Sequence, residues 1–185
     1  GIRFPSHPIM REILWELGGA VAAPSANTFG RISPTQAEHV AQDLGAILPL
    51  IIDGGMSDVG IESTIVDLSG ENVRILRPGI ITPHEISAVI GSPVAIEGGG
   101  DLRVSGALVS HYAPKTSLKI VESERLLHEV QNQIKNGQSV AVLAFNQPEI
   151  NHHLIEWNCL PLDPNVYAHE LYAVLHKMDK KSHAM

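Results

Sequence analysis

The stretch AAPSANTFGRISPT, residues 22–35, decides how the first half of this chain is interpreted. It follows a short apolar run and gathers hydroxyl and amide side chains around Gly30. If a strand runs through PSAN, Ser25 and Asn27 point to the same face, because they are two positions apart. Such groups can bind a phosphate or a carboxylate, and Gly30 would let a ligand approach the backbone. A local turn is the alternative interpretation of Ser25 and Asn27.

Ser33 can be interpreted in two ways. In SPTQ, residues 33–36, serine stands at an N-cap position, proline follows it, and glutamine comes three positions after the cap. This pattern is typical of a capping box and predicts a helix over 33–45. Because a helix N-terminus also favours anions, capping and ligand binding are equally open for Ser33.

Periodicity and turn residues outline the remaining elements of the first half. The Thr82 and Glu85 pair is typical of a capping box, with a proline at the first helical position. The expected elements are a helix over 6–18, buried strands over 20–24 and 48–53, a hairpin of strands 63–68 and 73–79, and a helix over 82–91.

A second pattern begins after a Gly-rich segment. Residues 92–116 show no steady period and are expected to form a linker. From residue 117 onward, strands and helices alternate, which favours a parallel sheet with crossover helices. The expected elements are strands over 117–121, 139–145 and 153–160 and helices over 123–136 and 165–178.

Composition excludes several classes of function. The net charge of −7 disfavours broad binding to nucleic acid or to an anionic membrane. No apolar run approaches the ~20 residues that span a bilayer, and no signal peptide is visible. Cys159 is the only cysteine, which fits a cytoplasmic protein, and its apolar neighbours predict a buried structural thiol. No phosphate loop, dinucleotide fingerprint or metal motif is present, so no metal site is expected.

Charged and hydroxyl side chains gather at the expected hairpin. GIESTIVDL, residues 60–68, brings Ser63 to the start of one strand, and ILRPG brings Arg77 to the end of the next. If these strands pair, Arg77 lies near Ser63. Arg3 stands where a strand would meet a helix. Two guanidinium groups among several hydroxyls suit a small carboxylate and a nucleotide phosphate.

Tyr112 follows His111 in SHYAP, within the expected linker. An aromatic side chain in such a segment can anchor the linker to a domain. It can also cover a bound base or sugar as part of a lid. The residue types alone favour the anchor.

Taken together and in order, these motifs resemble a known family. IRFPSHP, APSANTFGRISPT, DGG, GIESTIVDL and ILRPGIITPHEI are similar to the second half of the YrdC-type domain of threonylcarbamoyl-AMP synthases. SGALVSHYAPKT and the segment after it resemble the linker and C-terminal domain of the long form of that family. The resemblance implies an α/β protein with three parts. These are the C-terminal portion of a twisted YrdC-type sheet domain (1–91), a linker or lid (92–116) and a smaller Rossmann-like parallel domain (117–185).

The resemblance also implies an activity. Members of this family convert L-threonine, bicarbonate and ATP into threonylcarbamoyl-adenylate and pyrophosphate. The product passes to a tRNA-modifying transferase complex that makes N6-threonylcarbamoyladenosine. Mg²⁺ is expected to accompany the ATP, because phosphoryl chemistry rests on positioning and on cations. Two alternatives stay open, a non-catalytic module that binds double-stranded RNA and a carbamoyl transferase with a different acceptor.

Family residues carry over position by position. No covalent nucleophile is expected, because the carbamate of threonine would itself attack the nucleotide. A Lys-x-Arg motif of the family's N-terminal half is absent, so this chain alone is expected to be inactive. The resemblance assigns ATP binding to Ser25, Asn27, Ser33, Arg77 and Tyr112, and threonine binding to Arg3, Ala23 and Ser63.

Overall fold

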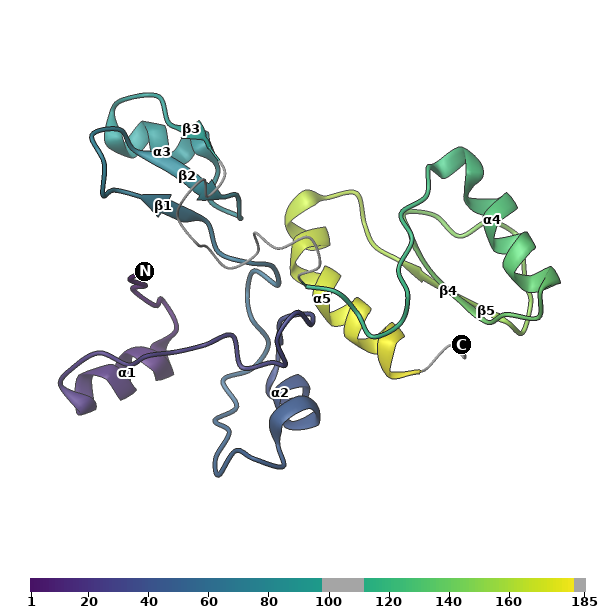
Figure 1. Ribbon diagram of the computed structural model, residues 1–185, viewed down its shortest axis with the longest axis horizontal. Coiled ribbons are helices and arrows are strands. Elements are labelled where there is room, and N and C mark those ends of the chain that lie inside the picture. Colours follow the sequence, from purple (N-terminus) through teal and green to yellow (C-terminus); the bar gives the residue numbers. More distant parts are fainter. Residues whose placement is uncertain (98–111, 182–185) are drawn as a thin grey trace.

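The computed structural model describes residues 1–97 and 112–181 of the chain, which form a two-domain α/β fold (Figure 1). We call residues 1–97 the first unit and residues 117–181 the second unit. The first unit contains α1 (Pro8–Leu17), α2 (Ala37–Leu44), β1 (Ile65–Asp67), β2 (Arg74–Arg77), α3 (Pro83–Ile90) and β3 (Ala95–Ile96). The second unit contains α4 (Ser123–Lys135), β4 (Val140–Ala144), β5 (Ile155–Cys159) and α5 (Pro164–Lys180).

The expected hairpin is confirmed. β1 and β2 pair antiparallel, with a register shift after Ile65. Ile75 on β2 is fully buried, so the hairpin carries the core of the first unit. Asp67 accepts hydrogen bonds from the side chain and backbone of Ser69 and from Arg74, and these bonds lower the pKa of Asp67 to about 2. The turn that joins the two strands is therefore closed by charge as well as by backbone pairing.

The capping box at the start of α3 is also confirmed. Thr82 Oγ1 accepts from the Glu85 backbone, and the Glu85 carboxylate accepts from the Thr82 N–H at 2.7 Å. β3 lies in the segment expected to be a linker and pairs parallel to β2, so the sheet continues beyond residue 91. Residues 98–111, and with them His111 and most of that segment, lie outside the described residues.

Three expected strands do not form, at 20–24, 48–53 and 117–121. Most of their apolar side chains are exposed; Leu50 is 72% exposed and Ile120 is 94% exposed. A strand exists only through hydrogen bonds to a neighbour, and these stretches have no partner strand among the described residues. Local composition therefore indicated an extended, apolar segment without indicating what it pairs with.

The parallel arrangement expected for the second unit is confirmed. β4 and β5 pair in parallel over five residues each, and the α5 N-terminus is capped by the Asp163 carboxylate. Cys159 is exposed, contrary to the expected buried thiol. It ends β5 between Asn158 and Leu160, both of which are buried. Side chains alternate along a strand, so Cys159 faces away from the core.

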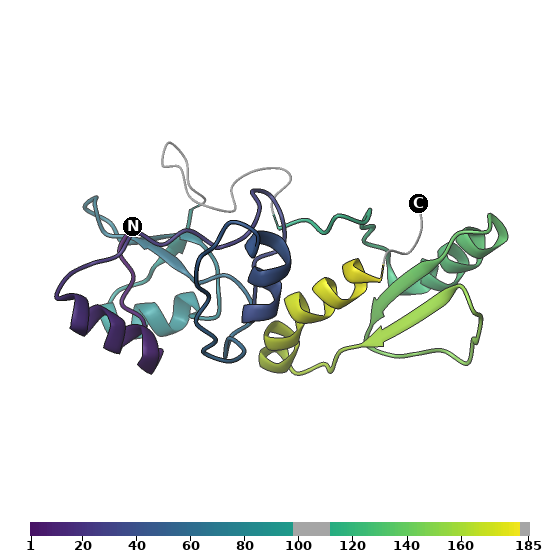
Figure 2. The same ribbon diagram turned by 90° about the horizontal axis from the view of Figure 1, so that it is seen from below.

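Helix α5 is the part of the second unit that faces the first unit. Figures 1 and 2 both place it with β4 and β5 on one side and α2 on the other. In the part of the chain that the structure describes, no helix combines the length and apolar character needed to cross a membrane. The fold therefore brings a helix of the second unit against residues 22–35 of the first unit, which we call the polar loop.

Candidate functional site

Arg77 and Ser63 form the centre of a polar cluster. The Arg77 guanidinium donates to the Ser63 carbonyl from Nε (3.0 Å) and from Nη2 (2.9 Å), and Nη2 also reaches Ser63 Oγ at 3.3 Å. β1 and β2 bring the two residues together because Ser63 leads into β1 and Arg77 ends β2. The expected proximity of Arg77 and Ser63 is therefore confirmed.

Arg3 brings a second positive charge to the same hydroxyl. Its Nη2 donates to Ser63 Oγ at 2.9 Å, across sixty positions of sequence. Arg3 is exposed, whereas only 12% of the Arg77 side chain is accessible. The exposed Arg3 and the largely buried Arg77 thus both reach the Ser63 hydroxyl, Arg3 from the solvent and Arg77 from within the protein. This is an arrangement that suits an anionic ligand.

Glu62 connects the cluster to the polar loop. Its carboxylate lies 3.5 Å from Arg77 Nη1 and accepts a short hydrogen bond from Ser33 Oγ. Helix α2 begins at Ala37 with Gln36 as its N-cap, so the expected capping role of Ser33 is wrong. The Ser33 hydroxyl is used for a tertiary contact instead. Glu62 precedes Ser63 in GIESTIVDL, and the sequence gives it no role because nothing local shows which residue it faces.

Tyr112 closes another side of the cluster. Its hydroxyl accepts a hydrogen bond from Arg77 Nη1 at 2.9 Å, and its ring lies 6.2 Å from that of Tyr172 on α5. Burial and the Glu62 charge raise the pKa of Tyr112 against the opposing effect of Arg77. Burial, Glu62 and Tyr112 raise the pKa of Tyr172 to about 12. Both phenols are therefore neutral hydrogen-bonding groups at physiological pH.

The chain after Tyr112 is tied to the polar loop. The Ala113 N–H donates to the Gly30 carbonyl at 3.0 Å, and Arg31 Nη1 donates to the Pro114 carbonyl at 3.2 Å. Gly30 is thus approached by another part of the chain, where the sequence suggested a ligand. These bonds hold Tyr112 over the loop that contains Ser33.

The PSAN segment does not continue a strand. Ala26 has a φ of +56°, so the expected alternation that would place Ser25 and Asn27 on one face is wrong. The Asn27 amide donates to the carbonyls of Arg31 (2.9 Å) and Ile32 (3.3 Å), which makes a local turn. Asn27 Oδ1 is buried and has no hydrogen-bond partner among the described residues. Asn27 Oδ1 therefore keeps an unused acceptor position.

Ser25 and Ala23 are exposed on the same loop. Within residues 1–97 and 112–181, no side-chain hydrogen bond joins Ser25 to the Arg77 cluster. The structure therefore brings together five of the eight expected site residues and leaves three on the neighbouring loop. The convergent residues are Arg3, Ser33, Ser63, Arg77 and Tyr112; the others are Ala23, Ser25 and Asn27.

Two histidines that sequence reasoning did not single out lie beside this loop. The rings of His39 on α2 and His176 on α5 stack with centroids 3.9 Å apart, and His39 is buried. Burial, followed by the neighbouring His176, lowers the pKa of His39 to about 4. Polar residues on an otherwise ordinary amphipathic helix were the only available signal, and many solvated helices share it.

The cluster can bind negative charge. It combines two guanidinium groups, hydroxyls from two serines and two phenols close to a loop with an unsatisfied amide oxygen. In the described ranges, no group of three or more His, Cys, Asp or Glu side chains could hold a metal ion. Glu62, the carboxylate of the cluster, is occupied by Ser33 and Arg77.

Known protein families match both parts of the chain. The family described as "Telomere recombination" (Sua5, YciO and YrdC proteins) matches residues 1–79, and "Threonylcarbamoyl-AMP synthase, C-terminal domain" matches residues 81–185. The threonylcarbamoyl-AMP synthase of Bacillus subtilis (strain 168) is 42% identical over 79% of this chain and 44% of its own length. That of Pyrococcus abyssi (strain GE5 / Orsay) is 38% identical over 67% of this chain and 38% of its own length.

Solved structures of Sua5 proteins share the fold of this chain. The crystal structure of P. abyssi Sua5 complexed with L-threonine matches with a TM-score of 0.79 at 31% identity, covering 96% of this chain and 54% of that one. The fold and the site thus define a two-domain α/β protein with a cationic, hydroxyl-lined cluster. The chain belongs to the threonylcarbamoyl-AMP synthase family. It spans about half the length, or less, of the relatives that it matches.

Proposed function

We propose that the natural protein carrying this chain makes threonylcarbamoyl-adenylate and pyrophosphate from L-threonine, bicarbonate and ATP. The convergence of Arg3, Ser63 and Arg77 carries the proposal, because it offers two cations and a hydroxyl at one place. The L-threonine bound by a Sua5 relative of the same fold supports an amino-acid ligand. The product would be consumed by a tRNA-modifying transferase complex.

We assign some residues of the cluster to threonine and others to ATP. Arg3 and Ser63 would hold threonine, with Ala23 contributing from the loop. Arg77 would face the nucleotide phosphates, and Ser33 and Tyr112 would fix its orientation. Asn27 and Ser25 would add loop contacts. For Asn27 the buried acceptor without a partner supports this role, whereas Ser25 and Ala23 rest on the family resemblance alone.

The proposed reaction needs positioning more than covalent catalysis. A carbamate oxygen of threonine attacks the α-phosphorus of ATP, and the bond from that phosphorus to the bridging oxygen breaks as pyrophosphate leaves. Arg77 would stabilise charge on the phosphate oxygens, because its guanidinium is held in place before the ligand arrives. Mg²⁺, if it accompanies the nucleotide, would supply further positive charge and be held largely by the phosphates.

The division into parts stays a proposal. We assign residues 1–91, extended by β3, to the YrdC-type domain and residues 117–185 to the C-terminal domain, with the linker between them. The second unit has its own buried core, which includes Val130, Val142 and Leu160. That separate core supports a boundary before α4.

Pyrophosphate release tests the proposed function. Because the chain spans about half the length of its relatives, the assay uses the natural polypeptide that carries it. We expect release that requires ATP, L-threonine and bicarbonate, and that falls to background when any one of them is omitted. Release that is independent of threonine would overturn the proposal. Binding of a double-stranded RNA without any release would favour the RNA-binding alternative.

A further inference from the structure

Helix α5 presents a polar stripe to the first unit. His169, Tyr172, His176 and Lys180 are spaced by three, four and four positions, so they lie along one face of the helix. His169 Nδ1 donates to the Asp58 carbonyl at 2.8 Å, and Lys180 Nζ pairs with Glu38 at 2.9 Å. The stripe therefore contacts the first unit along most of its length.

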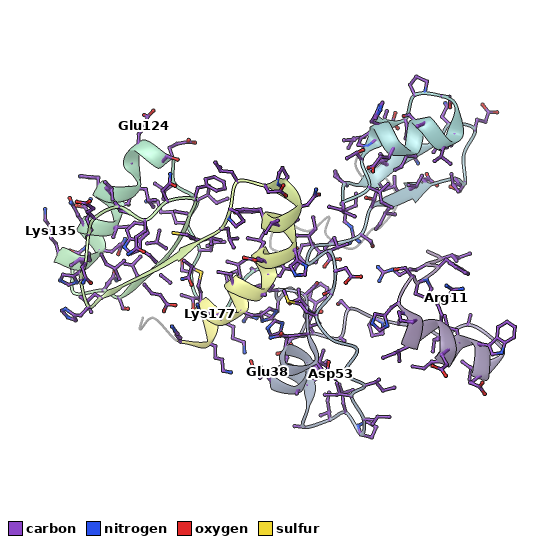
Figure 3. All side chains as sticks on the ribbon, turned by 180° about the vertical axis from the view of Figure 1, so that it is seen from behind. Arg11, Glu38, Asp53, Glu124, Lys135 and Lys177 are labelled. Atoms are coloured by element: carbon purple, nitrogen blue, oxygen red, sulfur yellow. The ribbon has the colours of Figure 1, made fainter. Side chains whose placement is uncertain are left out.

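Another face of α5 belongs to its own domain. The ring of Tyr167 lies 5.6 Å from that of Phe145, and Lys177 Nζ donates to Asn158 Oδ1 at 3.3 Å. Leu175 and Met178 on α5 are buried. Figure 3 shows Glu38 on α2 close to the end of α5 that carries Lys177. A helix that contacts its own unit through some side chains and the first unit through others can fix one unit relative to the other.

His176 is the member of the stripe that reaches the candidate nucleotide site. Its Nε2 donates to the Ser33 carbonyl at 3.1 Å. The hydroxyl of Ser33 donates in turn to Glu62, and Glu62 pairs with Arg77. A continuous series of polar contacts thus runs from the second unit to the guanidinium that would face the phosphates.

His39 contributes to this contact from the first unit. We call the contact of His176 with Ser33 and His39 the joint. It stacks on His176, and its Nδ1 accepts the Thr35 N–H at 3.2 Å, so a neutral His39 carries its proton on Nε2. Two charged imidazolium rings in this stack would repel each other, which adds to the cost of charging the buried His39. The charged groups that face the pair are Glu38 and Asp43 on α2 and Lys180 on α5.

We infer that His176 is a positioning residue for the nucleotide site. It holds the carbonyl of Ser33, and through Ser33 it holds the Glu62–Arg77 pair in a geometry that accepts ATP. The second unit is then an integral part of the site rather than an appended module. This inference rests on the proposed function for its kinetic consequence, but the contact itself can be tested without any activity.

The experiment compares three variants of the natural polypeptide that carries this chain. His176→Ala removes the donor, His176→Gln keeps a neutral amide donor, and His84→Ala changes an exposed histidine on α3 as the control. We expect His176→Ala to raise the KM for ATP by about 3- to 10-fold, the value of one lost hydrogen bond, with kcat changed less. We expect His176→Gln to recover most of the affinity and His84→Ala to match the parent.

A second readout does not depend on activity. Amide hydrogen exchange over residues 33–39 of the unliganded protein should quicken in His176→Ala and stay unchanged in His84→Ala. Unchanged exchange in His176→Ala would overturn the inference, and so would equal KM values in the parent and His176→Ala. If exchange quickens but the parent releases no threonine-dependent pyrophosphate, the joint stands and the proposed function fails.

Discussion

The guanidinium of Arg77 donates a hydrogen bond to the hydroxyl of Tyr112 at 2.9 Å, although the two residues are 35 positions apart. The same guanidinium holds the carbonyl of Ser63 through two further bonds. Arg77 therefore fixes the residue that enters β1 and the chain that follows the linker at the same time. The planar guanidinium directs N–H donors from separate nitrogens toward both partners, whereas an ammonium group carries all its donors on one nitrogen.

Arg77→Lys is expected to weaken ATP binding by about 10- to 100-fold, because lysine keeps the charge but loses the planar fork. Isothermal calorimetry with ATP measures the change directly. Arg11→Lys serves as the control, since Arg11 is exposed on α1, apart from α5 and the second unit in Figure 3. Equal affinities in the parent and Arg77→Lys would remove Arg77 from the proposed site.

Glu62→Gln is expected to strengthen the binding of ATP or pyrophosphate by about 2- to 5-fold. Glutamine keeps an oxygen that can accept from Ser33 but removes the negative charge beside Arg77. The negative charge of Glu62 offsets up to about 1 kcal/mol of the attraction between Arg77 and a phosphate, whereas the arrangement that Ser33 holds is kept in the variant. Titration with pyrophosphate checks the result, and weaker binding in the variant would contradict the expected competition.

Gly60→Ala is expected to disturb the contact between the units. Gly60 has a φ of +75°, and a Cβ placed there would overlap the carbonyl oxygen of His169 on α5. Gly137→Ala is a matched control, because its φ is +74° and a Cβ there meets nothing within 4 Å. We expect the control to lose about 1–2 kcal/mol of stability through backbone strain alone.

Gly60→Ala should lose more than this control in urea unfolding, and it should also quicken amide exchange in α5. If both alanine variants are destabilised equally and α5 exchange is unchanged, the close approach of Gly60 to α5 does not hold the two units together. The comparison separates the steric contact from the conformational cost that both glycines share.

Folding stability should depend on pH through His39. The folded pKa of about 4 lies below the ordinary 6.5, so between these values the unfolded chain binds a proton that the folded chain does not. Stability is therefore complete above pH 6.5 and falls as the pH drops toward 4, by up to about 3 kcal/mol. Urea unfolding at several pH values measures this loss.

His39→Asn is expected to flatten this part of the pH profile, because the variant has no titrating group at the position. Its stability at pH 7 should also fall, since the stack with His176 is lost. His128→Asn, which changes an exposed histidine on α4, should keep the slope of the parent. A slope that persists in His39→Asn would place the pH dependence elsewhere.

Several elements could be predicted from sequence because their signals lie between near neighbours in the chain. Three elements formed as expected: the Thr82–Glu85 capping box, the hairpin around the turn at residues 69–72, and the parallel β4–β5 pair. The capping box joins residues three positions apart, and the strands of the hairpin and of the β4–β5 pair follow a short hydrophobic period bounded by turn residues. Such signals are complete within the segment that carries them.

Other features could not be predicted because their partners are distant. The apolar stretches 20–24 and 48–53 indicated strands, but no neighbouring strand is present among the described residues to pair with them. Ala26 adopts a left-handed conformation that the PSAN motif did not indicate. Cys159 turned outward because of its register on β5, where a shift of one residue reverses the face.

The sequence by itself determined the family, the order of the elements and the proximity of Arg77 to Ser63, since paired strands follow from local turns and periodicity. Only the tertiary structure decided the partners of Ser33: Glu62, which is 29 positions away, and His176, which is 143 positions away. A hydroxyl or a carbonyl accepts many partners, so its choice depends on which helix face packs against it. His176 reaches Ser33 because the face of α5 that also carries His169 and Lys180 packs against the first unit.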